Sequence, residues 1–204
     1  KDALVADFTE VVVTASDSLL IGDATDSGNT KRDTVQGILD LVSGGGITMA
    51  GAMVASASQT SIDFTGIPST AKRIVLMLNG FSTNATSQMK VLVGDSGGFE
   101  TTSYVGGVIN GGGADYSAAT ASGVPIIYSQ TAAALYTGVI RIDLMDSATN
   151  RWNFQSILNY ESGVDMHSGT ASKSLSGVLT QVRLTTVNGT DTFDAGNVNL
   201  LYGE

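Results

Sequence analysis

The pentapeptide GDSGG at residues 94–98 is the string that surrounds the nucleophilic serine of chymotrypsin-like proteases. A serine hydroxyl becomes an effective nucleophile only when a nearby base takes its proton and oxyanion donors stabilise the product charge. The single histidine, His167, lies far downstream of Ser96, whereas the order in these proteases is His, Asp and then Ser. We therefore predict that Ser96 belongs to a glycine-rich turn between two strands.

Acidic side chains offer a second kind of chemistry, because a pair of carboxyl groups can cleave a glycosidic bond. The four glutamates of the chain stand in no recognisable constellation. Asp95 and Glu100 could approach each other across a turn, but solvated loop acids are the ordinary explanation of such residues. The sequence therefore predicts no catalytic residue and a protein that is not an enzyme.

Two segments gather the carboxylate and amide oxygens that Ca²⁺ prefers, GDATDSGN at 22–29 and NGTDTFD at 188–194. Neither has the spacing of a D-x-[DN]-x-[DN]-G loop, and Asx-turns explain both. The chain has no cysteine, which excludes disulfides, thiol catalysis and thiolate metal sites. We expect no bound metal and no cofactor.

The composition indicates a globular chain rich in β-structure. Of its 204 residues, 42% are hydrophobic and only 14% are charged, so uncharged groups must form much of the polar surface. The net charge is −9, and the longest basic runs are the pairs at 31–32 and 72–73, so we expect no nucleic-acid partner. No apolar run approaches the roughly 18 residues of a membrane-spanning helix, so we expect no membrane insertion.

Residues 1–45 form the first predicted domain, which ends at the glycine hinge of residues 43–46. Short strands are expected at 11–13 and 19–21. They are followed by a helix whose apolar positions 35, 38, 39 and 42 have helical spacing and which Asp33 can cap. About forty residues without disulfides rarely fold alone. We predict an N-terminal strand-and-helix oligomerisation segment, buried against copies of itself or against another protein.

Residues 46–204 form the second predicted domain, an antiparallel, jelly-roll-like β-sandwich in an all-β chain. Strand patterns recur with turn signals between them, at 61–65, 72–80, 89–95, 102–110, 124–130, 137–146, 151–160, 177–187 and 197–202. In the strand at 137–146, Ile140, Ile142 and Leu144 face one way and Arg141 faces the other, as a sheet with one wet face requires. The pair at 188–189, Asn-Gly, predicts a two-residue hairpin turn.

Two long segments rich in small residues, 110–123 and 161–174, are predicted to be loops. Loops mounted on a rigid sandwich commonly carry recognition. Each segment holds isolated larger side chains, Asp115 and Tyr116 in the first and Asp165 and His167 in the second. We predict these four residues as receptor contacts, with a mobile loop or a trimer contact as the alternative.

Several extended strings resemble those of tailed-bacteriophage tail fibres. The stretches at 61–87, 91–106 and 182–202 are similar to a C-terminal β-sandwich module of phage and prophage fibres, and 16–42 resembles a segment that precedes fibre tips. The resemblance implies a homotrimeric, non-enzymatic virion protein on the particle surface, in the tail rather than the head. Its tip would attach to a glycan or protein of the bacterial host, and its N-terminal segment would bind other virion proteins.

Two alternatives to a receptor-binding tail fibre stay open. The same module could serve as a capsid decoration or head-fibre protein with a purely structural role. A surface-polysaccharide-degrading enzyme is the second alternative. Since residue 1 is lysine rather than methionine, we also expect the sequence to be a processed product or part of a longer chain.

Overall fold

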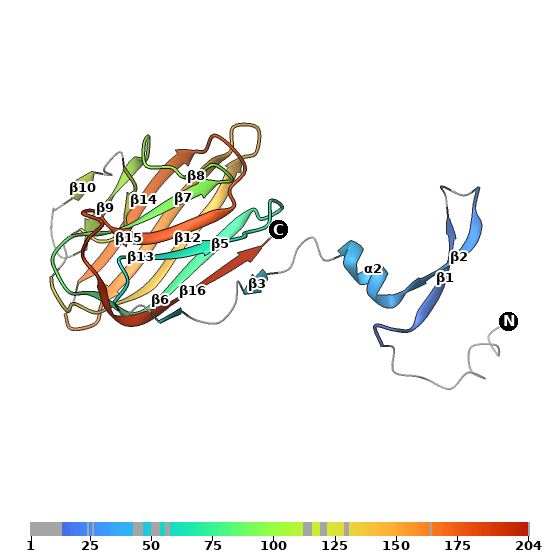
Figure 1. Ribbon diagram of the computed structural model, residues 1–204, viewed down its shortest axis with the longest axis horizontal. Coiled ribbons are helices and arrows are strands. Elements are labelled where there is room, and N and C mark those ends of the chain that lie inside the picture. The colour runs from blue at the N-terminus through green and yellow to red at the C-terminus, as the bar shows by residue number, and fades with distance from the viewer. Residues whose placement is uncertain are drawn as a thin grey trace. The chain divides into compact units, whose positions relative to one another are not determined.

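The computed structural model describes residues 14–23, 25, 27–42, 47–49, 54–55, 58–111, 116–118, 122–128, 131–163 and 165–203. The chain divides into two compact units, residues 1–46 and 47–204, and each is described by itself (Figure 1).

The N-terminal unit contains a two-stranded antiparallel sheet and one short helix. Strand β1 (Ser18–Asp23) pairs with β2 (Asn29–Thr34), and helix α2 (Val35–Val42) follows directly. The residue that caps this helix is Thr34, whose Oγ1 accepts a hydrogen bond from the Gly37 amide at 3.0 Å. The prediction that Asp33 is the cap was therefore wrong by one residue; Asp33 Oδ1 instead accepts a hydrogen bond from the Thr34 amide at 2.8 Å. The strand expected at 11–13 lies outside the described residues.

Strand β1 exposes its apolar side chains on both of its faces. Leu20 is 76% exposed, and its neighbours Leu19 and Ile21, which point to the opposite face, are 48% and 40% exposed. A two-stranded sheet is marginally stable on its own, because it has no second layer against which to bury such side chains.

The second unit is an antiparallel β-sandwich, so the prediction of an all-β sandwich is confirmed (Figure 1). The larger sheet follows the order β10-β9-β14-β13-β12-β6-β16-β3, with β4 also on β16. Its strands are β3 (Ile47–Met49), β4 (Val54–Ala55), β6 (Arg73–Thr83), β9 (Val105–Asn110), β10 (Tyr116–Ala118), β12 (Tyr136–Asp146), β13 (Arg151–Tyr160), β14 (Met166–Ser174) and β16 (Phe193–Gly203).

The smaller sheet follows the order β11-β7-β15-β5, with β8 also on β7. Its strands are β5 (Ser61–Thr65), β7 (Met89–Asp95), β8 (Gly98–Phe99), β11 (Val124–Pro125) and β15 (Gln181–Thr186). The two sheets share one hydrophobic core.

Alternation along the strands decides which side chains enter this core. Ile140 and Ile142 are fully buried, whereas Arg141 between them is exposed. On β13, Trp152 and Phe154 are buried at 2% and 1% exposure, so both are core residues. Leu144 is only half-buried; it is the last residue before a bulge that shifts the register between Leu144 and Asp146 at that end of β12.

Three further local predictions were wrong. The segment 110–123, expected to be a loop, contains the short strand β10, which pairs with β9. The segment 161–174, expected to be a loop, contains β14, a central strand between β9 and β13. The Asn-Gly pair at 188–189 does not close a two-residue hairpin, because β15 and β16 belong to different sheets. Asn188 Oδ1 accepts hydrogen bonds from the Thr190 and Asp191 amides, and Gly189 has a φ of +70°. This segment is therefore an Asx turn within the connection that leads from the smaller sheet to the larger one.

Candidate functional site

The GDSGG string forms the predicted turn, here between β7 and β8. Asp95, its second residue, is 7% exposed; its Oδ1 accepts a hydrogen bond from the Gly97 amide at 2.8 Å and its Oδ2 accepts one from Ser176 Oγ at 2.7 Å. Opposite Asp95 in the ladder is Gly98, whose φ of +121° favours glycine. The carboxylate in this string therefore holds a turn together.

Glu100 lies beside the same turn and pairs with a buried lysine. Its Oε1 accepts a hydrogen bond from the Ser176 amide at 2.6 Å, and its Oε2 forms an ion pair with Lys173 Nζ. The Lys173 side chain is 4% exposed and lies 5.5 Å from the centroid of the Tyr104 ring. Asp95 and Glu100 thus come close through Ser176, as the sequence allowed.

The protonation of these two carboxylates argues against an acid–base pair. The hydroxyl of Ser176 and then the Gly97 amide hold the pKa of Asp95 below its ordinary value. Burial opposes the charge of Glu100, but hydrogen bonds from Lys173 and Ser176 outweigh it and lower its pKa as well. A general acid for glycoside cleavage needs a raised pKa, and neither group has one.

His167 is buried in the core side of β14. Its side chain is 2% exposed, its Nδ1 accepts a hydrogen bond from the Tyr128 amide at 3.0 Å, and its ring centroid lies 5.5 Å from that of Tyr136. Burial lowers its pKa, with Asp165 opposing the shift. Six residues of extended strand, about 20 Å, separate His167 from Lys173 beside the GDSGG turn, so His167 cannot act as a base for Ser96.

The four predicted receptor contacts fare differently. Asp115 lies outside the described residues, and Tyr116 begins β10, where it pairs with Ile109. Asp165 is half-buried in the turn before β14, and its carbonyl accepts a hydrogen bond from the Tyr160 amide. The buried ring of His167 has no surface open to a receptor, so this residue holds the backbone at Tyr128 and forms no part of a binding face.

Three of those residues nevertheless lie at one end of the larger sheet, which we call the loop end. Strands β10, β9 and β14 are neighbours, and the Gly111 amide donates a hydrogen bond to the Met166 carbonyl at 2.7 Å. Met166 is 49% exposed there. Nearby, Tyr136 packs against Tyr160 with ring centroids 5.7 Å apart, and burial raises the pKa of Tyr136 to about 12.

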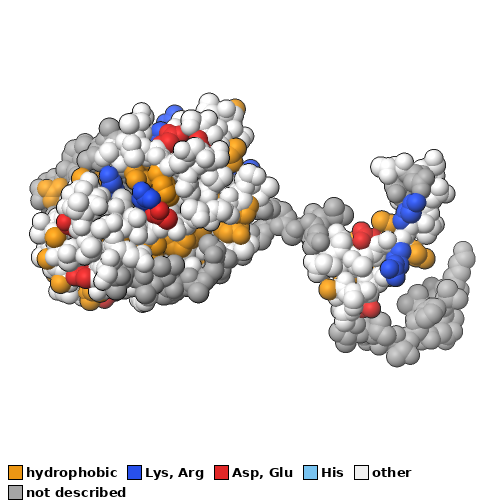
Figure 2. Space-filling model, in the orientation of Figure 1, with side chains coloured by type: hydrophobic (Ala, Val, Ile, Leu, Met, Phe, Trp, Pro, Cys, Tyr) orange, Lys and Arg blue, Asp and Glu red, His pale blue; other side chains and the backbone are white. Residues whose placement is uncertain are grey.

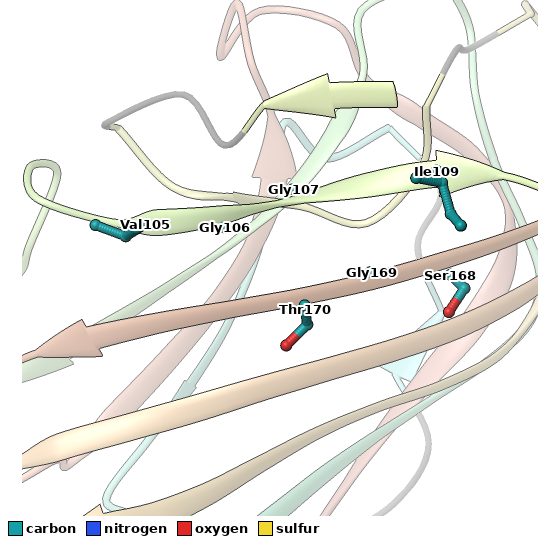
Figure 3. Close-up of a pocket in the computed structure, with 7 residues that line it drawn as sticks. All are labelled: Val105, Gly106, Gly107, Ile109, Ser168, Gly169 and Thr170. Carbon is teal, nitrogen blue, oxygen red and sulfur yellow. The ribbon is translucent and has the colours of Figure 1, made fainter. Parts of the chain in front are cut away.

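A shallow groove of about 510 Å³ lies on the outer face of the larger sheet, over β9 and β14 (Figure 3). Glycines at 106 and 107 on β9 and at 169 on β14 form much of it. Val105 and Ile109 stand at its two ends on β9, and Ser168 and Thr170 line it from β14. Val105 is 70% exposed and Ile109 is 49% exposed, so the groove offers apolar side chains, hydroxyl groups and backbone to a ligand.

Sequence reasoning missed this groove because it treated β14 as a loop. The strand has a period of two in which Ser168, Thr170, Ser172 and Ser174 alternate with His167, Gly169, Ala171 and Lys173. Small residues on the inner side hide this period, since hydrophobic patterning is the usual signal of a strand. Alternation of hydroxyl groups over eight positions was the signal that could have found it.

Among the residues that the structure describes, no three His, Asp or Glu side chains gather in a way that could hold a metal ion. No described helix has the length and apolar character needed to cross a membrane. Uncharged surface predominates over charged side chains on the face seen in Figure 2, in keeping with the 14% charged composition.

No protein-family model matches the chain, and no curated protein is significantly similar to it in sequence.

Proposed function

We propose that this chain is a non-enzymatic phage virion protein, a tail fibre or receptor-binding protein, that attaches the particle to the surface of a bacterial host. The observation that carries the proposal is the open groove on the outer face of the larger sheet, beside the loop end. A rigid sandwich with a recessed, largely uncharged face suits recognition of another surface. The resemblance of the strings at 61–87, 91–106 and 182–202 to fibre modules agrees with this role.

The residues best suited to chemistry support binding rather than catalysis. Asp95 and Glu100 are engaged by Ser176 and Lys173, and His167 accepts a backbone hydrogen bond inside the core. Each of these side chains stabilises the sandwich, so none is available to a substrate at the surface. The groups that face solvent around the groove are instead hydroxyls, glycines and aliphatic side chains, which bind without reacting.

The N-terminal unit would join copies of the chain into a homotrimer and connect them to other virion proteins. Leu19, Leu20 and Ile21 support this part of the proposal, because contact with further copies would remove them from water. Three tips on one particle would also repeat a weak contact, so that avidity compensates for modest affinity at each site.

Cell binding provides the direct test. The purified, fluorescently labelled chain is incubated with a panel of bacterial strains and binding is measured by flow cytometry. We expect it to bind particular strains and to slow adsorption of phages that infect them. Ser168→Trp, which fills the groove, should reduce binding, whereas Thr65→Trp on the exposed face of β5 is the matched control. Absence of binding to every strain, together with antibody labelling of capsids in intact particles, would favour the decoration role.

A further inference from the structure

The outer side of β14 presents a row of four hydroxyl side chains, Ser168, Thr170, Ser172 and Ser174. Because alternate residues of a strand share a face, neighbours in this row are about 7 Å apart and the row is about 20 Å long. Thr170 and Ser174 are exposed, and the other two are partly exposed. We call this row, with its partners on β13, the hydroxyl track.

Strand β13 places hydrogen-bond donors beside these hydroxyls. Gln155 pairs in register with Thr170, Asn153 with Ser172, and Arg151 with Ser174. Gln155 and Arg151 are exposed, and Arg151 Nη2 lies 3.4 Å from Ser172 Oγ. Side-chain amides donate and accept, a guanidinium presents several donors, and hydroxyls do both, so the track can bind a ligand dense in hydroxyl groups.

Two hollows lie along this track. The groove described above contacts its first half, and a second hollow of about 190 Å³ is lined by Ser103, Val105, Arg151, Ser172, Lys173 and Ser174. Val105 lines both hollows, so they adjoin at this residue and together extend from the loop end to the Arg151 end of β14. An extended ligand would therefore fit better than a compact one.

Charge differs between the two ends of the track. Ile109 and Ile157, the neighbours of Ser168 in register, are uncharged and about half exposed, at 49% and 54%. The opposite end of this outer face carries three guanidinium groups and two carboxylates, on Arg73, Arg141, Arg151, Asp143 and Asp146. Asp143 is held by Arg73 at 2.6 Å and by Arg141 at 2.8 Å, and Asp146 stands opposite Arg151 in the ladder. These three positive and two negative groups sum to one positive charge, on a chain of net charge −9.

We propose that the hydroxyl track binds an extended glycan chain that carries an acidic sugar at the Arg151 end. Sugar hydroxyls would exchange hydrogen bonds with Thr170, Ser172 and the amides of β13, and the C–H faces of the rings would pack on Val105 and Ile109. The guanidinium of Arg151 would bind the carboxylate of the acidic sugar. This inference rests on the proposed attachment function and names the class of host molecule that the chain attaches to.

The experiment separates a glycan ligand from a protein ligand on the cell surface. Strains that bind the labelled chain are treated either with periodate, which destroys vicinal diols, or with protease. We expect binding to be lost after periodate and kept after protease. The chain is also applied to a microarray of bacterial polysaccharides that includes neutral and uronic-acid-containing polymers, where we expect binding to the latter.

Variants of the chain, tested on the same strains and the same microarray, show which residues bind the glycan. Thr170→Val removes one hydroxyl at nearly constant volume and should weaken binding roughly threefold to tenfold. Arg151→Gln should weaken binding to acidic polymers about tenfold or more and abolish their advantage over neutral ones. Thr65→Val makes the same exchange on an exposed strand position of the smaller sheet and should change nothing. Unchanged thermal unfolding would show that each variant folds.

The outcomes distinguish this inference from the proposed function. Binding to cells that survives periodate but not protease, with Thr170→Val unaffected, would overturn the glycan track while leaving attachment in place. Absence of binding to every strain would contradict attachment itself. In that case a signal on the polysaccharide array that depends on Arg151 would still support the track, and absence of any signal there would overturn it.

Discussion

The two faces of β14 differ in what their polar groups bind. On the inner side, Lys173 pairs with Glu100 and His167 accepts a hydrogen bond from the Tyr128 amide, so both side chains find their partners within the protein. On the outer side, Thr170 and Ser174 face solvent. Residues that attract attention for their chemistry thus stabilise the fold, and unremarkable hydroxyl side chains form the surface open to a ligand. Four predictions test this contrast, from the largest expected effect on stability to the smallest.

Removal of Glu100 should have the largest effect. Glu100→Ala leaves the Lys173 ammonium, which is 4% exposed, without its partner, and should lower the free energy of unfolding by about 3 kcal/mol. Urea denaturation measures this change. The double variant Glu100→Ala, Lys173→Met removes the buried charge as well and should recover part of the loss; a double variant as unstable as the single one would show that the ion pair is not the cause.

Removal of the Ser176 hydroxyl should cost less, since one hydrogen bond to a charged group is lost. Ser176→Ala leaves Asp95 Oδ2 without the donor at 2.7 Å and should lower the free energy of unfolding by about 1–2 kcal/mol. Ser174→Ala, two residues earlier but on the exposed face, should change it by less than about 0.5 kcal/mol. Equal losses in the free energy of unfolding for the two substitutions would contradict the contrast between buried and exposed polar groups.

Acidification should lower the stability of the folded protein in two stages, through His167 and then through Asp95 and Glu100. His167 has a lowered pKa in the folded state, so the unfolded state binds more protons and stability falls as the pH drops through about 6.5. Asp95 and Glu100 also have lowered pKa values, so their contribution is present above the unfolded values of 3.8 and 4.5 and is lost as the pH falls through and below them.

Thermal unfolding followed at several pH values would resolve the two stages. His167→Gln keeps an acceptor for the Tyr128 amide without a titrating ring. This variant should remove the upper stage and leave the lower one unchanged. A full upper stage in His167→Gln would assign it to a different group.

The smallest change in stability is expected on the outer face. Thr170→Val should alter the midpoint of urea unfolding by the equivalent of less than about 0.5 kcal/mol, because its hydroxyl is exposed. In the same samples, binding to bacterial cells should fall. A large loss of stability in Thr170→Val would mean that the outer hydroxyls serve the fold as the inner groups do.

The sequence predicted the sandwich well wherever hydrophobic alternation was strong. The strands at 61–65 and 89–95 coincide with β5 and β7, and those at 137–146 and 151–160 differ from β12 and β13 by at most one residue. The strand prediction failed in β14, where small polar residues rather than hydrophobic ones alternate. The hairpin prediction failed at Asn188, because the chain there crosses from one sheet to the other instead of turning back within one sheet. The segment at 124–130 was over-extended, since of its described residues, 124–128, only 124–125 form a strand.

The candidate site was harder to predict than the fold. The two segments that the sequence singled out for receptor contacts, with Tyr116 and Asp165, do lie near the groove in the structure, because β10, β9 and β14 are neighbours in the sheet. The burial of His167 could not be anticipated, since a polar ring next to Gly and Ser looks like a loop residue until its partner, the Tyr128 amide, is known. The groove lies where Gly107 of β9 is opposite Thr170 of β14 and Gly169 is opposite Val108, neighbours that only the sheet register reveals.

In the proposed virion role, the exposed apolar side chains of β1 would also affect how the chain assembles. If copies of the chain cover Leu20 and its neighbours, the stability of this unit depends on protein concentration. In a chain without partners, proteases could then cleave the two-stranded sheet. Cleavage would then remove chains that failed to assemble, while completed assemblies would survive. The N-terminal unit would in this way act as a check on stoichiometry before any tip reaches a cell.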